Sequence, residues 1–160
     1  MKDDIVAPQP VDAGPHAVGF RAFVPASPEE VWALVANPHR HHEFDGSGTV
    51  KSQAIGPHEL AEGTKFSVHM RKFGVPYRLP LRVTRAERNR TVEWRQPTGH
   101  RWRWEIEPAE GGVIVTETFD TSRQLPPARA ALKAAGVLKE NAANMQASLV
   151  RMRGLFPEGI

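Results

Sequence analysis

The feature that most constrains the fold is a series of short segments in which apolar and polar residues alternate between residues 49 and 121. A period of two is typical of strands that bury one face. Turn residues separate the segments, so consecutive strands are expected to pair antiparallel. Pro76 and Pro80 indicate an edge or a bulge around the third segment. The six candidate strands are TVKSQAI (49–55), KFSVHMRK (65–72), YRLPLRVTRAE (77–87), TVEWRQP (91–97), HRWRWEIEP (100–108) and VIVTETFDT (113–121).

Helical signals lie on both sides of this run. The motif SPEE at 27–30 is a capping box with proline at the first helical position, and the proline at 38 predicts an end near residue 37. A second short helix is expected over 39–44. Near the end of the chain, apolar residues recur in steps of three and four, which is the spacing of one helix face. Gly136 either kinks this helix or ends a shorter first one. The stripe consists of Ala131, Ala135, Leu138, Ala142, Met145, Leu149, Met152 and Phe156.

The order of these elements predicts an α+β fold. Another alternating segment, AVGFRAFV at 17–24, adds a seventh strand before the first helix. A seven-stranded antiparallel sheet with one apolar face needs a cover, and the long C-terminal helix has the matching stripe. We therefore expect the sheet to curl around that helix. The small alanines at the start of the stripe permit either close packing or a hollow between the two layers.

Three stretches carry a resemblance to a known family: SPEEVWALVANPHRHHEFDGSG at 27–48, WRWEIEP at 102–108 and GGVIVTETFD at 111–120. Together with the order of elements, they resemble the polyketide cyclase/dehydrase and lipid-transport superfamily, which is related to START domains (SRPBCC). The resemblance covers residues 17 to about 156. It implies the helix-grip fold and a hydrophobic cavity. It implies no shared catalytic set, because the family includes aromatase/cyclases, lipid and hormone carriers, and quinone-binding proteins.

Strand parity predicts which side chains line the implied cavity. Along each strand the apolar residues fall on one parity and the charged residues on the other, so an error of one residue in register would be costly. The three tryptophans at 94, 102 and 104 either pack as core or form an aromatic wall for a flat, apolar ligand. The expected lining is Phe44, Phe66, Val68, Met70, Tyr77, Leu79, Leu81, Trp94, Gln96, Trp102, Trp104, Glu117, Phe119, Leu138 and Met145.

Glu117 is the carboxylate that parity places on the apolar side of its strand. A buried carboxylate is unfavourable unless it is paired or protonated. Tyr77, Gln96 and His100 are candidate partners. Two interpretations stay open: Glu117 lies at the mouth of the cavity or is turned outward, or it is a polar anchor or an acid with a raised pKa inside the pocket.

Three histidines, His39, His41 and His42, lie beside Glu43 in the second short helix. Residues one or two apart on a helix point in different directions, and the chain has no cysteine to complete a site, so we expect no metal. We expect no cofactor either. The resemblance implies that this helix closes one end of the cavity, with Phe44 as a gate residue.

Composition sets the remaining expectations. We expect a flexible leader over 1–16 and a single START-like helix-grip domain over 17–160 in a chain of 160 residues. The net charge is +3 and the cations are scattered, which favours a solvated surface over a nucleic-acid or anionic-membrane face. No apolar run reaches the roughly 18 residues of a membrane span, and the N-terminus lacks signal-peptide features. These patterns predict a cytoplasmic monomer or homodimer without a nucleic-acid partner.

Three functions are compatible with these expectations. The favoured one is binding or transport of a small hydrophobic molecule, such as a lipid, a polyketide or a quinone-like ring. The second is a polyketide cyclase, aromatase or dehydratase that uses Glu117 with Tyr77 or His100 as acid–base groups. The third is a protein-interaction module whose cavity has collapsed. The carrier is favoured because the sequence offers one inward carboxylate and no nucleophile motif.

Overall fold

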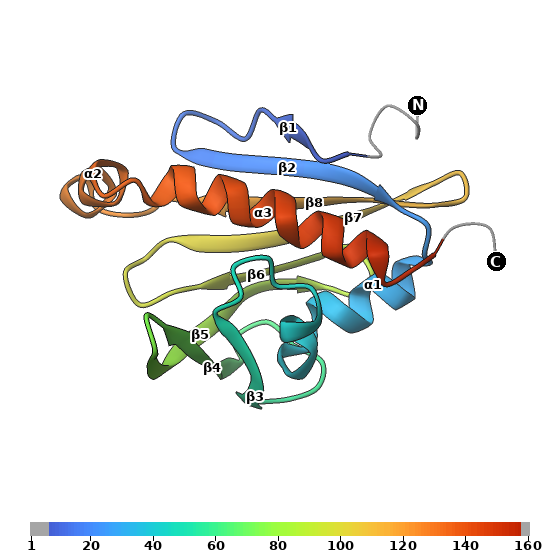
Figure 1. The fold of residues 1–160 in the computed structure, drawn as a ribbon, viewed down its shortest axis with the longest axis horizontal. Coiled ribbons are helices and arrows are strands. Elements are labelled where there is room, and N and C mark those ends of the chain that lie inside the picture. The colour runs from blue at the N-terminus through green and yellow to red at the C-terminus, as the bar shows by residue number, and fades with distance from the viewer. Residues whose placement is uncertain (1–6, 158–160) are drawn as a thin grey trace.

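A curved antiparallel sheet wraps around one long helix in the computed structural model, which describes residues 7–157 except for the side chain of Ser52 (Figure 1). Within these residues the sheet has eight strands, in the order β1-β2-β8-β7-β6-β5-β4-β3, and all neighbours are antiparallel. This arrangement confirms the helix-grip fold. The strands are β1 (Gln9–Val11), β2 (Ala17–Val24), β3 (Val50–Ile55), β4 (Lys65–Lys72), β5 (Val75–Glu87), β6 (Thr91–Arg95), β7 (Arg101–Ala109) and β8 (Gly112–Asp120).

The sheet has one strand more than the seven expected, and the addition comes from the segment predicted as a flexible leader. Strand β1 pairs with β2, with Gln9 opposite Arg21 and Val11 opposite Gly19. A Cβ atom at Gly19 would lie 2.6 Å from a methyl carbon of Val11, so glycine is what permits this close approach. The rest of the expected leader, residues 1–6, lies outside the described residues.

Four helical segments complete the fold within the described residues: α1 (Pro28–Val35), the 3₁₀ helix η2 (Pro38–Glu43), α2 (Pro126–Ala134) and α3 (Val137–Gly154). The capping box forms as predicted, because the Glu30 amide donates to Ser27 Oγ at 3.1 Å and the Ser27 amide donates to Glu30 Oε1 at 3.0 Å. Gly136 separates α2 from α3 with a φ of +75°, so it ends a short first helix. None of the helices in residues 7–157 combines the length and apolar character needed to pass through a membrane.

The apolar stripe predicted along the C-terminal helix is confirmed only in its second part. Met145, Leu149 and Met152 are buried on α3, which lies across the concave face of the sheet (Figure 1). Ala131 and Ala135 are exposed, because they lie on or beside α2, which has no buried residue and projects beyond the end of the sheet. The break at Gly136 therefore removes the first turns of the stripe from the core.

The two prolines of β5 lie where this strand has a single neighbour. Strand β4 pairs with β5 along its first part, where Ser67 lies opposite Pro80 and Arg71 opposite Pro76, whereas β6 pairs with β5 only from Arg82 onward. Proline has no amide hydrogen to donate to a neighbouring strand, so it is tolerated at such a locally unpaired edge. The register then shifts between Val83 and Arg85, which is the bulge that the sequence left as an alternative.

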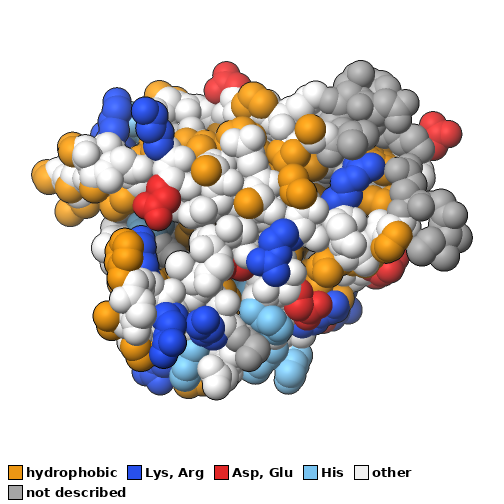
Figure 2. Space-filling model, in the orientation of Figure 1, with side chains coloured by type: hydrophobic (Ala, Val, Ile, Leu, Met, Phe, Trp, Pro, Cys, Tyr) orange, Lys and Arg blue, Asp and Glu red, His pale blue; other side chains and the backbone are white. Residues whose placement is uncertain are grey.

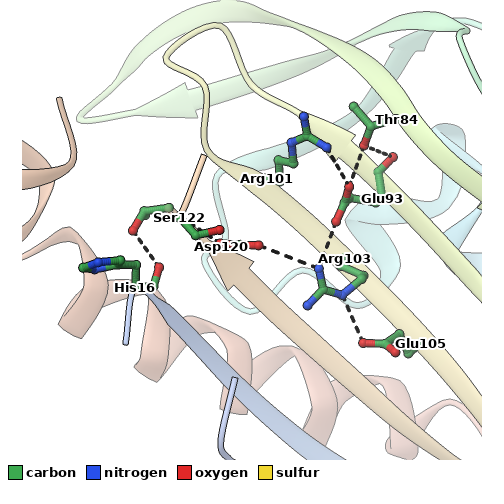
Figure 3. Close-up of polar contacts among 9 residues, drawn as sticks. His16, Thr84, Glu93, Arg101, Arg103, Glu105, Asp120 and Ser122 are labelled. Carbon is green, nitrogen blue, oxygen red and sulfur yellow. Dashed lines mark hydrogen bonds and ion pairs between the residues drawn. The ribbon is translucent and has the colours of Figure 1, made fainter. Parts of the chain in front are cut away.

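The outer face of the sheet carries a charged network centred on Glu93 (Figure 3). Arg103 donates to Glu93 Oε2 at 2.9 Å, while Arg101 and Thr84 donate to Oε1 at 3.1 and 2.9 Å. Burial alone would raise the pKa of Glu93, yet these hydrogen bonds outweigh it and lower the pKa. Asp120 adds a longer contact to Arg103 at 3.8 Å, so the network joins four adjacent strands, β5 to β8.

Replacing Glu93 with glutamine should lower the free energy of unfolding by about 3 kcal/mol at neutral pH, because two partly buried arginines lose their anion. The pKa of Glu93 is lower in the folded state than its usual 4.5, so this stabilisation is present above that value and is lost as the pH falls through the folded pKa. Urea unfolding at several pH values measures the difference between variant and parent, which should shrink in acid.

Glu105→Gln is the matched control for this prediction. Its side chain is 48% exposed and pairs only with Arg103 among the ion pairs of the described residues. The expected loss is about 0.5 kcal/mol or less. Equal losses for the two variants would contradict the role assigned to burial.

Candidate ligand pocket

A cavity of about 400 Å³ lies between the concave face of the sheet, the first turns of α3 and the loop that follows η2. This volume falls in the range of small-molecule sites, about 300–1,000 Å³. The structure places these expected lining residues on its wall: Phe44, Val68, Met70, Tyr77, Leu79, Leu81, Trp94, Gln96, Trp102, Trp104, Glu117 and Met145. The wall also includes His41, Asp45, Ser47, Thr49, Val50, Lys72, His100, Val137, Glu140, Asn141, Asn144 and Ser148.

Three residues expected on the wall lie elsewhere. Phe66 is buried behind it, with its ring edge-on to Trp94 at 5.8 Å. Phe119 is buried beside the rings of His100 and Trp102, with ring centroids 5.0 and 4.8 Å away. Leu138 is half-buried off the wall, and its neighbour Val137 lines the cavity instead. Leu138 shares a face of α3 with Met145 and Leu149, so helical spacing alone could not show that it stays off the wall.

Aromatic rings form one side of the pocket. Trp94 stacks on His41 with ring centroids 5.1 Å apart and planes 23° apart. Trp104 meets the edge of Phe44 at 5.3 Å. Trp94 and Trp102 are direct neighbours across β6 and β7, so the two indoles lie on the same face of the sheet. The tryptophans thus pack against other rings and also border the open space.

Glu117 is buried in this wall, with only 5% of its surface exposed. Its nearest cross-strand neighbours are Trp104 on β7 and Phe20 on β2. Within the described residues its Oε1 atom has no hydrogen-bond partner. Burial, with a smaller contribution from the charge of Asp45, raises the pKa of Glu117 well above its usual value. Burial therefore favours the neutral form of Glu117, whose hydroxyl could donate to a guest.

The candidate partners of Glu117 share the cavity with it but do not pair with it. Tyr77, Gln96 and His100 all line the wall, yet no hydrogen bond found among residues 7–157 joins any of them to Glu117. His100 Nδ1 lies 2.7 Å from Thr98 Oγ1 instead. Burial lowers the pKa of His100 to about 4, so this ring is neutral as well.

Sequence reasoning missed His41 as a pocket residue. Its ring is buried, and Nε2 donates to the Val35 carbonyl at 2.9 Å. Burial lowers the pKa of His41 to about 4 against the raising effect of that bond, so the ring is neutral and Nδ1 is left as an acceptor. A 3₁₀ helix brings residues i and i+3 onto one side, so the spacing of His41 and Phe44 was the available signal.

The loop after η2, residues 45–49, is held tightly against α3 and is called here the clamp loop. The Gly46 amide donates to Ser148 Oγ at 2.8 Å, and Ser47 Oγ donates to Asp45 Oδ2 at 2.7 Å. A Cβ atom at Gly46 would lie 2.5 Å from backbone atoms of Asn144 and Ser148. The close contact of Gly46 with α3 therefore fixes this side of the pocket.

An ion pair crosses the rim of the pocket. Lys72 Nζ, at the end of β4, lies 3.7 Å from Glu140 Oε1 on the first turn of α3, and both side chains line the cavity. Both are about half exposed, so the pair contributes little to stability and can open. Among residues 7–157, no group of three or more histidine or acidic side chains is placed to hold a metal ion.

Replacing Gly46 with alanine should destabilise the protein by about 1 to 3 kcal/mol, because the added methyl group forces the clamp loop away from the α3 backbone. Gly154→Ala is the matched control, since nothing lies within 4 Å of the methyl group that it adds near the end of α3. Urea unfolding of both variants measures the effect. A Gly46→Ala protein as stable as the control would show that the loop is not clamped.

Comparisons with known proteins agree with this architecture. The family model described as polyketide cyclase/dehydrase and lipid transport matches residues 16–156. The uncharacterized protein Rv0088 of Mycobacterium tuberculosis is 41% identical over 161 aligned residues, which cover 99% of this chain and 72% of that protein.

Solved structures show the same fold at low sequence identity. A protein from Rhodobacter sphaeroides is 19% identical, with a TM-score of 0.71 and coverage of 92% of this chain and 96% of that one. An AHSA1-like protein from Aeromonas hydrophila is 20% identical, with a TM-score of 0.56 and coverage of 90% and 98%. Because the family model matches most of this chain, the chain belongs to the polyketide cyclase/dehydrase and lipid transport family.

Proposed function

We propose that this protein binds a small hydrophobic molecule that carries a ring and a carbonyl group, such as a quinone or a polyketide. The observation that carries the proposal is Glu117, a buried acid in the wall of a largely apolar cavity of about 400 Å³, whose Oε1 atom has no hydrogen-bond partner among residues 7–157. A buried polar group without a hydrogen bond is unfavourable, and a carbonyl oxygen on a guest would satisfy the Glu117 hydroxyl.

Burial of the ligand supplies most of the affinity in this proposal. Removing about 300 Å² of apolar ligand surface from water, at roughly 25 cal/mol per Å², gives about 7 kcal/mol before the cost of association. That is enough for roughly micromolar binding if the pocket is already formed. The rings of Trp94, Trp102 and Trp104 offer flat faces to such a guest, and the clamp loop and α3 hold the opposite side in place.

An enzyme is the second candidate, and one observation favours it. Burial raises the pKa of Glu117 and lowers the pKa of His41 and His100 to about 4, so a carboxyl group and two neutral imidazoles border the same cavity. A cyclase or dehydratase needs such groups within reach of one substrate. His100, however, is engaged by Thr98, and Tyr77 is 40% exposed. We therefore favour binding without catalysis, and the open cavity argues against a collapsed interaction module.

Two probes of similar shape test the role of Glu117. Menadione, a methylated naphthoquinone with two carbonyl groups, should bind about fivefold more tightly than methylnaphthalene, which has none, because one hydrogen bond to a buried donor is worth about 1 kcal/mol. Quenching of tryptophan fluorescence measures both affinities. Glu117→Gln keeps a donor and should keep the preference, whereas Glu117→Leu should bind both probes equally.

The control for this experiment is Glu140→Gln at the rim, where the side chain is 57% exposed and the preference should not change. A Glu117→Leu protein that still prefers menadione would remove Glu117 from recognition, and failure of both probes to bind the parent would contradict the pocket proposal. Native mass spectrometry of protein purified from its own host would then identify the natural ligand by its mass.

A further inference from the structure

We propose that the turn joining β4 and β5 docks this protein on an anionic phospholipid bilayer. In this proposal Phe73 and Val75 enter the interface, and neighbouring cations contact lipid phosphates. The surface is the hairpin end, residues 71–78, together with Lys51 of the adjacent strand β3. The inference goes beyond the pocket function and does not depend on which ligand the pocket binds.

Phe73 occupies a position that folding alone does not favour. It is 94% exposed, and its φ is +52°, followed by Gly74 at +75°. Lys72 and Val75 are the last pair before the turn, so two residues with positive φ form a hairpin turn of type I′. Asparagine or aspartate before glycine is preferred there, and a bulky residue with positive φ is strained. An exposed aromatic ring at such a strained backbone position indicates a role for Phe73 at the tip.

The apolar surface continues from the tip to the pocket. Val75 is 61% exposed and Tyr77 is 40% exposed, on the same strand as the turn. Lys72 Nζ lies 5.7 Å from the centre of the Phe73 ring, and the same amine forms the rim ion pair with Glu140. Lys72 and Tyr77 also line the cavity, so the tip lies beside the pocket opening. Tyrosine and lysine are typical of side chains at a membrane interface.

A second hollow, of about 390 Å³, lies against the same hairpin and provides the charge. Lys51, Arg71 and Arg78 line it, and none of the ion pairs found among the described residues involves these three cations. The sequence contains no acidic residue between Lys65 and Ala86 that could neutralise them. Figure 2 shows lysine and arginine side chains beside hydrophobic ones at this end of the molecule.

A bilayer fits this combination better than a nucleic acid does. Cations alone would suit any polyanion, but a nucleic acid backbone offers no apolar phase for the exposed Phe73 and Val75. An anionic bilayer offers phosphates at its surface and an apolar layer directly beneath them. The apolar tip lies next to three cations that have no ion pair within the described part of the chain, which matches that order of layers.

Cosedimentation of the full chain with vesicles tests the proposal. We expect binding to vesicles of phosphatidylcholine mixed with phosphatidylglycerol, weaker binding to phosphatidylcholine alone, and loss of the difference at about 1 M salt, where charges are screened beyond about 3 Å. Phe73→Asn should reduce the partition coefficient about tenfold through lost apolar burial. The same change should not lower the unfolding midpoint, because Asn-Gly is the preferred type I′ turn.

Two further variants separate charge from general stickiness. Arg78→Gln should weaken binding to the anionic vesicles about fivefold and leave binding to phosphatidylcholine unchanged. Ile55→Asn is the control for Phe73→Asn, since Ile55 is 52% exposed on the edge strand β3, opposite Ser67 and away from the tip. The partition coefficient of Ile55→Asn should change less than twofold, because surface substitutions away from a contact have small effects.

Several results would overturn the proposal: no binding of the parent chain to anionic vesicles at low salt, unchanged binding of Phe73→Asn, or an equal loss in Ile55→Asn. A change in self-association on Phe73→Asn, seen by analytical ultracentrifugation without vesicles, would assign the tip to a protein contact instead. Vesicle binding needs no pocket probe, so failure here and failure of the menadione experiment are distinguishable.

Discussion

The incomplete contact between α3 and the sheet is the constraint on which the pocket depends. Met145, Leu149 and Met152 anchor the second part of the helix in the core, while the first turns present the small polar side chains Asn141 and Asn144 to the cavity. A hollow of about 400 Å³ remains because no large side chain from the helix fills it. The clamp loop, the aromatic wall and the rim ion pair all surround this gap.

The pKa of a buried carboxylate shifts in opposite directions on the two faces of the sheet. On the outer face, Glu93 accepts hydrogen bonds from Arg101, Arg103 and Thr84, and its pKa is lowered. On the inner face, Glu117 Oε1 has no hydrogen-bond partner among the residues that the structure describes, and burial raises the pKa of Glu117. Ionised Glu93 therefore links neighbouring strands through its hydrogen bonds. Glu117 lines the cavity instead, and its burial favours the neutral form. The contrast explains why we assign recognition to one face only.

The sequence was sufficient for much of the fold because strand parity and capping are local signals. The alternating segments, the Ser27 capping box and the curled sheet follow from them. Two features could not be predicted from such signals, and a third, His41, was overlooked. Strand β1 has only three residues, too few for a period to appear. Leu138 keeps the spacing of Met145 and Leu149 on α3, so periodicity placed it on the wall although it lies outside the cavity lining. His41 reached the pocket through the threefold phase of a 3₁₀ helix, where α-helical spacing had been assumed.

The central claim is that Glu117 is a neutral acid inside an open pocket, and its side-chain carboxyl carbon reports this directly. In ¹³C NMR of the free protein, assigned by comparison with Glu117→Gln, this carbon should keep the chemical shift of a protonated acid at pH 7 and should titrate only at higher pH. A shift typical of an ionised carboxylate throughout the neutral range would show that the group is paired or solvated, and would contradict the account.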